Sequence, residues 1–153
     1  MATRALQRIS ASEDACYLTE ASLARELGEL VVSTTSPVRC QEAAPEFDYA
    51  SGRADIVARD TRDHVHAFEA KLIRWRDALE QARRNTCFAH YCYVALPSRS
   101  AAPALKARNE FRRHGVGLVV LTGQIATLAI RPRRNVPLLP WLTKLAMAFV
   151  SRE

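Results

Sequence analysis

The chain has 153 residues and a net charge of +6, with 48% hydrophobic and 25% charged residues. This size and composition are typical of one soluble globular domain with its own core, and they exclude a disordered tail. No apolar run reaches the ~18–20 residues that span a bilayer, and the N-terminus lacks the apolar segment of a secretory signal. We therefore expect a cytoplasmic protein without a membrane partner, whose positive charge suits a partner made of phosphates.

The four cysteines are scattered along the chain, at Cys16, Cys40, Cys87 and Cys92. Without a secretory signal, free thiols in a reducing compartment are expected. The cluster Cys87-x-x-His90-x-Cys92 offers three zinc ligands, but a second pair at the spacing of a structural zinc site is missing. We therefore expect buried or half-buried thiols at these positions.

The first third of the chain predicts a helix and then an extended segment. Ser10-Ala11-Ser12-Glu13 has the form of a capping box, and apolar residues recur at helical spacing up to Leu30. The helix starts either at this box or, after a turn, at Thr19. The β-branched residues within 31–40 predict a strand, in which Pro37 favours an edge position or a break. Residues 41–51 are then expected to form a loop.

Residues 52–72 predict a β-hairpin, because β-branched and apolar residues flank the polar turn Thr61-Arg62-Asp63. Antiparallel pairing about this turn places Asp55 opposite Glu69, and the two-residue period of a strand places Lys71 on the same face. Two carboxylates that face each other across a ladder repel. We therefore expect positive charge between them, such as a divalent metal with a neighbouring ammonium group.

The second half of the chain alternates helices and strands. The pattern predicts a helix from Ile73 to about Ala89, a strand at 91–96, a helix at 102–114 closed by Gly115, strands at 116–121 and 125–130, a basic linker at 131–135 and a helix at 138–150. In the first of these helices the apolar side chains cluster on one side and belong in the core; they are Trp75, Ala78, Leu79 and Ala82. The order of elements favours a mixed α/β sheet flanked by helices.

Asp55, followed fourteen positions later by Glu69-Ala70-Lys71, resembles the signature of the PD-(D/E)xK nuclease superfamily, which has the restriction-endonuclease-like fold. Ala54 replaces the proline of that signature, which costs little chemically because the proline binds nothing. The αβββαβ order of elements between Glu20 and Val120 also matches the core of the superfamily. The resemblance implies a mixed sheet with an added C-terminal hairpin and helix.

The resemblance implies a metal-dependent deoxyribonuclease acting in repair, recombination or defence. Asp55 and Glu69 would hold Mg²⁺, with Mn²⁺ as the alternative, and the backbone carbonyl of Ala70 would be a further ligand. Lys71 would hold or help deprotonate the attacking water and offset negative charge on the phosphate. Glu42, near the end of the expected first strand, either reaches the metal site or is a solvated loop carboxylate.

Supporting residues are expected on two helices. Gln81 lies beside the apolar side of the helix that follows E-x-K, where some families of the superfamily place a glutamine. Glu26 or Glu29 on the first helix is either the extra acid of related enzymes or a plain surface charge. Basic side chains of the second helix and of the linker either contact DNA phosphates or face solvent; those of the helix are Arg74, Arg76, Arg83 and Arg84.

Other interpretations stay open. A single domain, 1–153, is expected, with a core at about 19–121 and a C-terminal extension at 122–153. A non-catalytic nucleic-acid-binding or regulatory module of the same fold would not need a repelling carboxylate pair. A protein–protein interaction domain could use the C-terminal helix as its contact surface. RNA remains an alternative to DNA, and a homodimer or a partner protein is an alternative to a lone domain, because no base-reading module is visible.

Overall fold

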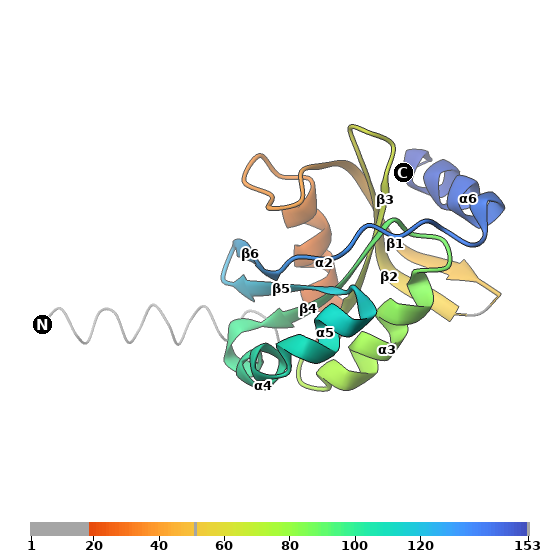
Figure 1. The fold of residues 1–153 in the computed structure, drawn as a ribbon. Helices are drawn as coiled ribbons and strands as arrows, with labels where there is room; N and C mark the ends of the chain where they lie inside the picture. Colours follow the sequence, from red (N-terminus) through yellow and green to blue (C-terminus); the bar gives the residue numbers. More distant parts are fainter. Residues whose placement is uncertain (1–18, 51, 153) are drawn as a thin grey trace, which may run out of the picture.

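The computed structural model describes residues 19–50 and 52–152, which form a six-stranded mixed sheet with helices on both faces (Figure 1). The strands are β1 (Cys40–Tyr49), β2 (Gly52–Asp60), β3 (Val65–Ala70), β4 (Tyr91–Pro97), β5 (Gly117–Thr122) and β6 (Ile125–Ile130). The helices are α2 (Glu20–Val31), α3 (Trp75–Asn85), η1 (Ser98–Ser100), α4 (Ala102–Lys106), α5 (Arg108–His114) and α6 (Pro140–Ser151). The expected capping box at 10–13 and Cys16 lie outside the described residues.

The strands lie in the sheet in chain order, β1 to β6. The β1–β2, β2–β3 and β5–β6 pairs are antiparallel, whereas β3–β4 and β4–β5 are parallel. A parallel pair requires a crossover connection, which α3 supplies between β3 and β4. The predicted mixed sheet with αβββαβ order, followed by a hairpin strand and a helix, is confirmed.

Helix α2 begins with a capping box different from the one expected at residues 10–13. The Thr19 hydroxyl accepts a hydrogen bond from the Ser22 backbone N–H at 3.0 Å, and the Ser22 side chain returns a contact to the backbone N–H of Thr19. The helix buries Leu23, Leu27 and Leu30 against the sheet. Within the described residues, the helix therefore starts just after Thr19, one of the two predicted starts.

The predicted strand at 31–40 is wrong, and the predicted loop at 41–51 is wrong over most of its length. Val31 is the last residue of α2, and residues 33–39 are turns and bends. Strand β1 occupies Cys40–Tyr49 instead, although its Gln, Glu, Ala, Pro and Asp residues rarely favour strands. Pairing with β2 overrides that local preference, and Pro45 is tolerated because β1 is an edge strand.

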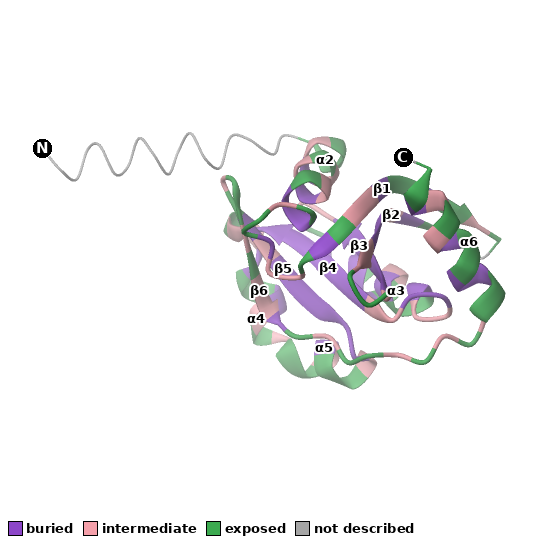
Figure 2. Cartoon of the chain, turned by 90° about the horizontal axis from the view of Figure 1, so that it is seen from above, coloured by how far each residue is buried: buried purple, intermediate pink, exposed green. Residues whose placement is uncertain are grey.

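Two apolar clusters fill the two faces of the sheet, and Figure 2 shows the buried middle strands in purple between the helices. On one face α2 packs against the sheet, and on the other face α3, α5 and α6 do so. The predicted core residues of α3 are buried, namely Trp75, Ala78, Leu79 and Ala82. Of the described cysteines, Cys40 and Cys92 are buried and Cys87 is half-buried, as expected, and all three are free thiols.

The C-terminal half follows the predicted order of elements, with the short helix η1 added, strand ends that shift by one residue and helices of different extent. Helix α3 ends at Asn85, and the helix predicted at 102–114 is split at Ala107 into α4 and α5. Gly115 closes α5 with a φ of 68°, a conformation that glycine adopts without strain. Helix α6 buries Leu142, Ala146 and Val150 against the sheet while Trp141 and Leu145 are exposed. None of the described helices has the length and apolarity needed to cross a membrane.

Candidate active site

The β2–β3 hairpin brings the two predicted carboxylates together. Its register pairs Ile56 with Phe68, so the next position places Asp55 opposite Glu69 on one face of the sheet. Oδ2 of Asp55 accepts the backbone N–H of Ala70 at 2.9 Å, which fixes that carboxylate against the end of β3. Only 1% of Glu69 is exposed.

Glu69 is a perturbed acid. Burial, and then the negative charge of Asp55, raise the pKa of Glu69 from near 4.5 to about 8, although a hydrogen bond from Asn85 and the charge of Lys71 act in the opposite direction. Perturbed carboxyl groups that face a second carboxylate in a cavity are common at functional sites. A cation bound between the two acids would stabilise the ionised form of both.

A buried chain of hydrogen bonds holds the Glu69 carboxylate from the side of α3. Nδ2 of Asn85 donates to Oε1 of Glu69 at 2.8 Å, and the Tyr49 hydroxyl donates to Oδ1 of Asn85 at 2.5 Å. Because a hydroxyl donates to its Oδ1, the Asn85 amide can present only its N–H groups to Glu69. Asn85 is fully buried. No feature of the sequence had pointed to Tyr49 or Asn85.

Lys71 extends beside the acids and meets α2. Its Nζ lies 3.3 Å from Oε2 of Glu20, the first residue of α2, and 22% of the Lys71 side chain is exposed. Its backbone N–H donates to the Ala95 carbonyl at 3.1 Å, which continues the pairing of β3 with β4. Glu26 and Glu29 are, from the sequence, either the extra acid of this helix or plain surface charges, and neither lines the cavity that holds Asp55 and Glu69. The structure instead brings Glu20 to Lys71.

These side chains line one cavity of about 360 Å³. Its lining is Glu20, Tyr49, Gly52, Arg53, Asp55, Glu69, Lys71, Gln81 and Arg84. All four side chains predicted to be catalytic, Asp55, Glu69, Lys71 and Gln81, are therefore in one place. A second cavity of about 660 Å³ lies between α2 and β1 and shares Glu20 and Asp55 with it. Glu29 lines that second cavity.

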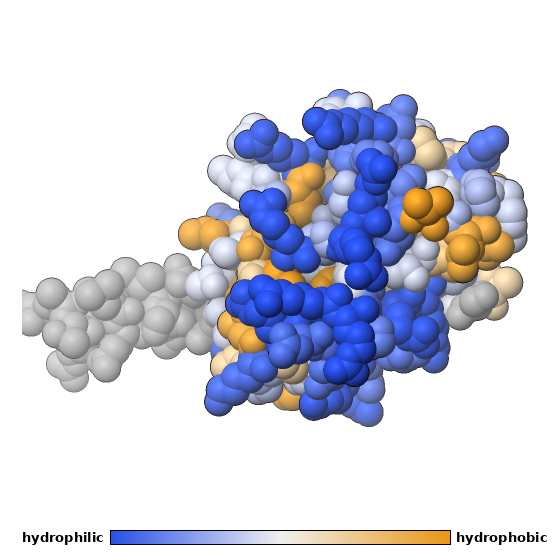
Figure 3. Space-filling model, viewed as in Figure 1, coloured by the Kyte–Doolittle hydropathy of each residue, from blue (hydrophilic) through white to orange (hydrophobic). Residues whose placement is uncertain are grey.

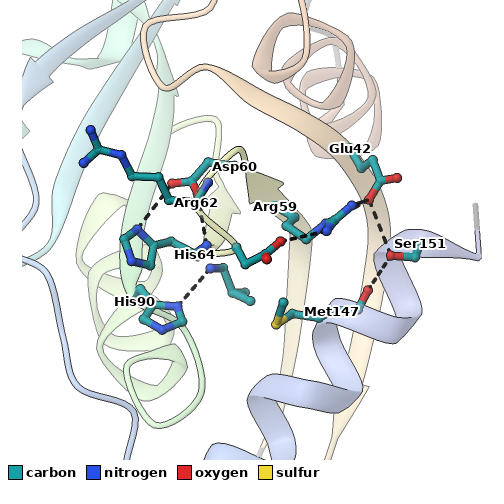
Figure 4. A network of polar contacts seen from close by, with 10 residues as sticks. Glu42, Arg59, Asp60, Arg62, His64, His90, Met147 and Ser151 are labelled. Atoms are coloured by element: carbon teal, nitrogen blue, oxygen red, sulfur yellow. Dashed lines mark hydrogen bonds and ion pairs between the residues drawn. The ribbon is translucent and has the colours of Figure 1, made fainter.

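Glu42 is not part of this cavity, which corrects the prediction that it reaches the metal position. Its Oε2 accepts from Arg59 at 2.8 and 3.1 Å and lies 3.5 Å from the Ser151 hydroxyl of α6 (Figure 4). Arg59 is four residues from Asp55, or about 13 Å along β2. The physical reason is that β1 begins near Glu42, at the opposite end of the hairpin from Asp55.

The four arginines predicted to bind phosphates, Arg74 at the N-cap of α3 and three within the helix, separate into two groups. Arg84 lines the cavity, with its Nε 3.8 Å from Glu80. The others form surface ion pairs, Arg74 with Asp77, Arg76 with Glu110 and Arg83 with Glu80. Figure 3 shows strongly hydrophilic side chains across the middle of the face on which α3, α5 and the linker after β6 lie. Contact of these arginines with nucleic acid stays a prediction.

The donor set fits Mg²⁺ or Mn²⁺. Within residues 19–50 and 52–152, no three His, Cys, Asp or Glu side chains converge as a metal-binding group. Mg²⁺ needs only one or two carboxylates, because it keeps several water ligands and also binds substrate phosphates. Asp55 and Glu69 meet that requirement, and their mutual repulsion is what a divalent cation would relieve. The carbonyl of Ala70 remains a predicted third ligand.

No family model and no curated protein sequence matches the chain. Among solved structures it is similar to SPO1766, a protein of unknown function from Silicibacter pomeroyi, with a TM-score of 0.64 and 16% identity, over 89% of this chain and 86% of that one. It is also similar to a repair endonuclease from Pyrococcus abyssi, with a TM-score of 0.47 and 14% identity, over 65% of this chain and 46% of that one. EndoMS in complex with double-stranded DNA has a TM-score of 0.40 and 16% identity, over 65% and 44% of the two chains. The first similarity shows a shared fold, and the other two are too weak to bear on function.

Proposed function

We propose that this protein is a metal-dependent nuclease that hydrolyses phosphodiester bonds in DNA. The observation that carries the proposal is the pair formed by the buried Glu69 and the half-buried Asp55, with Lys71 beside it, in a cavity that Gln81 and Arg84 also line. Burying one carboxylate opposite a second, half-buried one costs stability, and a domain with a purely structural role gains nothing from it. Binding of a divalent cation and of an anionic substrate would explain why the two carboxylates and Lys71 lie together.

Each side chain has a distinct task in this proposal. Asp55 and Glu69 hold Mg²⁺, which when bound polarises the phosphate and lowers the pKa of a coordinated water. The Lys71 ammonium holds the attacking water and offsets negative charge that develops on the phosphate. Gln81 is a neutral hydrogen-bonding group, suited to orienting water or substrate.

Glu20 and Asn85 support these residues from two helices. Glu20 accepts a hydrogen bond from Lys71 Nζ at 3.3 Å, which directs the ammonium across the cavity. Asn85 donates to Glu69 at 2.8 Å and so holds its carboxylate in one orientation. Arg84, at the rim, can contact a phosphate of the bound strand.

The proposal is tested by offering the full chain supercoiled plasmid and labelled single-stranded, duplex and branched DNA, with RNA in parallel. Each substrate is incubated with Mg²⁺, Mn²⁺ or EDTA, and the wild type is compared with Lys71→Ala. Cleavage that requires metal and is lost in Lys71→Ala supports the proposal, and the preferred substrate defines the kind of nuclease. Cleavage that continues in EDTA, or unchanged in Lys71→Ala, contradicts it. If no substrate is cleaved but DNA binds in a salt-sensitive way, the non-catalytic module replaces the nuclease.

A further inference from the structure

A third cavity, which is polar and has a volume of about 400 Å³, lies at the other end of the β2–β3 hairpin from Asp55 and Glu69. Asp60 on its wall is five residues from Asp55, or about 17 Å along β2. His66 and Glu69 are three positions apart on β3, so their side chains point to opposite faces of the sheet. The lining is Pro37, Val38, Arg39, Asp60, Thr61, Arg62, His64, His66, Tyr91, Tyr93, Leu128, Arg131 and Pro132. The cavity is thus separate from the candidate active site.

The floor of this cavity is a hydrogen-bonded chain from the half-buried Asp60 through the buried His66 to the buried Tyr93. His66 Nε2 lies 2.9 Å from Oδ2 of Asp60, and His66 Nδ1 lies 2.9 Å from the Tyr93 hydroxyl. A carboxylate only accepts, so Nε2 carries the hydrogen and Nδ1 accepts from Tyr93. Burial lowers the pKa of His66 more than the neighbouring Asp60 raises it. The neutral ring is therefore fixed in one tautomer.

Both oxygens of the Asp60 carboxylate form hydrogen bonds, one with His66 and the other with the turn of the hairpin. Its Oδ1 accepts the backbone N–H groups of Arg62 and His64, at 2.8 and 3.0 Å. Burial raises the pKa of Asp60, but the hydrogen bonds from His66 and these two amides outweigh it and hold the pKa below its ordinary value. Figure 4 shows the side chain of Arg62 extending away from this carboxylate. Asp60 is thus bound to groups other than the arginine side chains.

Three arginines form the rim, and they come from three separate segments of the chain. Arg39 follows α2, Arg62 lies in the hairpin turn and Arg131 follows β6. Within the described part of the chain, no carboxylate lies within ion-pair distance of these three guanidinium groups. The arginines of α3, in contrast, are all paired with acids.

Arg39 is held at the rim by a strained backbone. Its φ is 51°, in the left-handed region that long side chains rarely adopt. The buried Ser36 hydroxyl accepts the N–H groups of Val38 and Arg39, at 3.2 and 3.1 Å, and so maintains this turn. A glycine would adopt this backbone conformation with less strain. We therefore infer that the arginine side chain has a role at this position.

We propose that this cavity binds a phosphomonoester, carried by a free nucleotide or by the end of a nucleic-acid strand. The cavity holds three guanidinium groups and only one carboxylate, that of Asp60, so it carries an excess of positive charge. A dianion neutralises this excess better than a monoanion does. The volume is in the range of small-molecule sites. Tyr91, half-buried and stacked on His66 with ring centroids 4.8 Å apart, supplies an aromatic wall for the rest of the ligand.

Calorimetric titration of the full chain in EDTA tests this proposal. The ligands are inorganic phosphate, adenosine 5′-monophosphate, and one short oligonucleotide with and without a 5′-phosphate. The proteins are the wild type, Arg62→Ala, Arg131→Ala and the double variant, with Arg83→Ala as the control that removes one charge from α3. Loss of a charge-assisted contact at the rim should weaken binding about tenfold per arginine. Thermal unfolding of each variant confirms that the fold is retained.

The outcomes separate the two phosphate sources and also test the site itself. Binding of the mononucleotide identifies a nucleotide site, and binding of only the phosphorylated oligonucleotide identifies a strand-end site. Either result supports the proposal if both rim variants weaken it and Arg83→Ala does not. Equal binding of the two oligonucleotides without binding of the mononucleotide, equal weakening by Arg83→Ala, or no binding at millimolar ligand overturns it. Asp55→Asn should leave the binding of inorganic phosphate and of the mononucleotide unchanged, because Asp55 does not line this cavity, so failure of the nuclease proposal would not affect that result.

Discussion

Asn85, the last residue of α3, donates a 2.8 Å hydrogen bond from Nδ2 to Oε1 of Glu69 on β3, and both side chains are buried. The bond joins the helix that crosses the sheet to the strand that carries the E-x-K residues. The orientation of this carboxylate is therefore set by α3 as well as by the hairpin.

Replacement of Asn85 by Ala should reduce cleavage more than it reduces substrate binding. Loss of a residue that orients a metal-binding carboxylate typically costs about 10–100-fold in metal affinity or activity. The free energy of unfolding should fall by about 1–3 kcal/mol, because buried polar atoms of Glu69 and Tyr49 lose their partner. The measurements are the Mg²⁺ dependence of cleavage and the KM for DNA. An unchanged Mg²⁺ requirement and unchanged activity in a folded Asn85→Ala variant would refute the positioning role.

The metal-free protein should become less stable as pH rises from about 4.5 to about 8, through the titration of Glu69. The folded state holds this proton more tightly than the unfolded state does, so stability is greatest below the unfolded pKa and is lost as pH passes the folded one. The loss is on the order of a few kcal/mol.

Chemical denaturation of the wild type and of Glu69→Gln at the two ends of this pH range, in EDTA, measures the effect. Glu69→Gln removes the ionisation while keeping a similar shape, so the difference between the proteins isolates Glu69 from other titrating groups. The gap should change with pH in EDTA and shrink when Mg²⁺ is added. A gap that is independent of pH would show that Glu69 titrates normally.

Lys71 and Glu20 should differ in their effects on activity. Lys71→Ala should lower the cleavage rate by about 10²-fold or more without weakening metal binding, because it removes a positive charge from beside the acids. Glu20→Gln should cost about tenfold or less, since the Lys71 ammonium is retained and only its 3.3 Å partner changes. Rates at saturating Mg²⁺ give the comparison. Equal losses in the two variants would place Glu20 in a direct role.

Arg84 and Arg83 provide a matched pair for nucleic-acid binding. Both are on α3 and about half-exposed, but only Arg84 lines the candidate site, while Arg83 is bound to Glu80 at 2.6 Å. Arg84→Ala should weaken DNA binding and reduce the slope of log affinity against log salt by about 1. Arg83→Ala should change both much less. Fluorescence anisotropy over a range of salt concentrations reports the two quantities, and the reverse order of effects would move the DNA path away from this cavity.

The hairpin and its charged residues could be predicted because their signals are local. The alternation of apolar and charged residues on both sides of the turn fixes the register, and the register alone sets Asp55 opposite Glu69. Gly115 likewise indicates the end of α5 by its own conformational freedom. In each case the deciding interactions span only a few residues.

The features that the sequence does not predict depend on contacts between segments far apart in the chain. Tyr49 reaches Asn85 across 36 positions and Glu20 reaches Lys71 across 51, so neither pair leaves a pattern in the sequence. The sequence does not indicate strand β1 for a similar reason, because its pairing with β2 stabilises residues with a poor strand preference. The error in β1 also misplaced Glu42, whose position at the start of the strand puts it beside Arg59.

The most direct test of the account is the cleavage rate of Asp55→Asn beside that of Asp48→Asn, on the substrate that the wild type prefers. Asp48 is a nearby acid on β1 whose side chain is 78% exposed and lies 3.8 Å from Arg53, so the control makes the same chemical change outside the carboxylate pair. With Mg²⁺, the wild type and Asp48→Asn should cleave at similar rates, Asp55→Asn should be slower by about 10²-fold or more, and EDTA should stop all three. Cleavage by a folded Asp55→Asn at the wild-type rate would contradict the assignment of the catalytic centre to the Asp55–Glu69 pair.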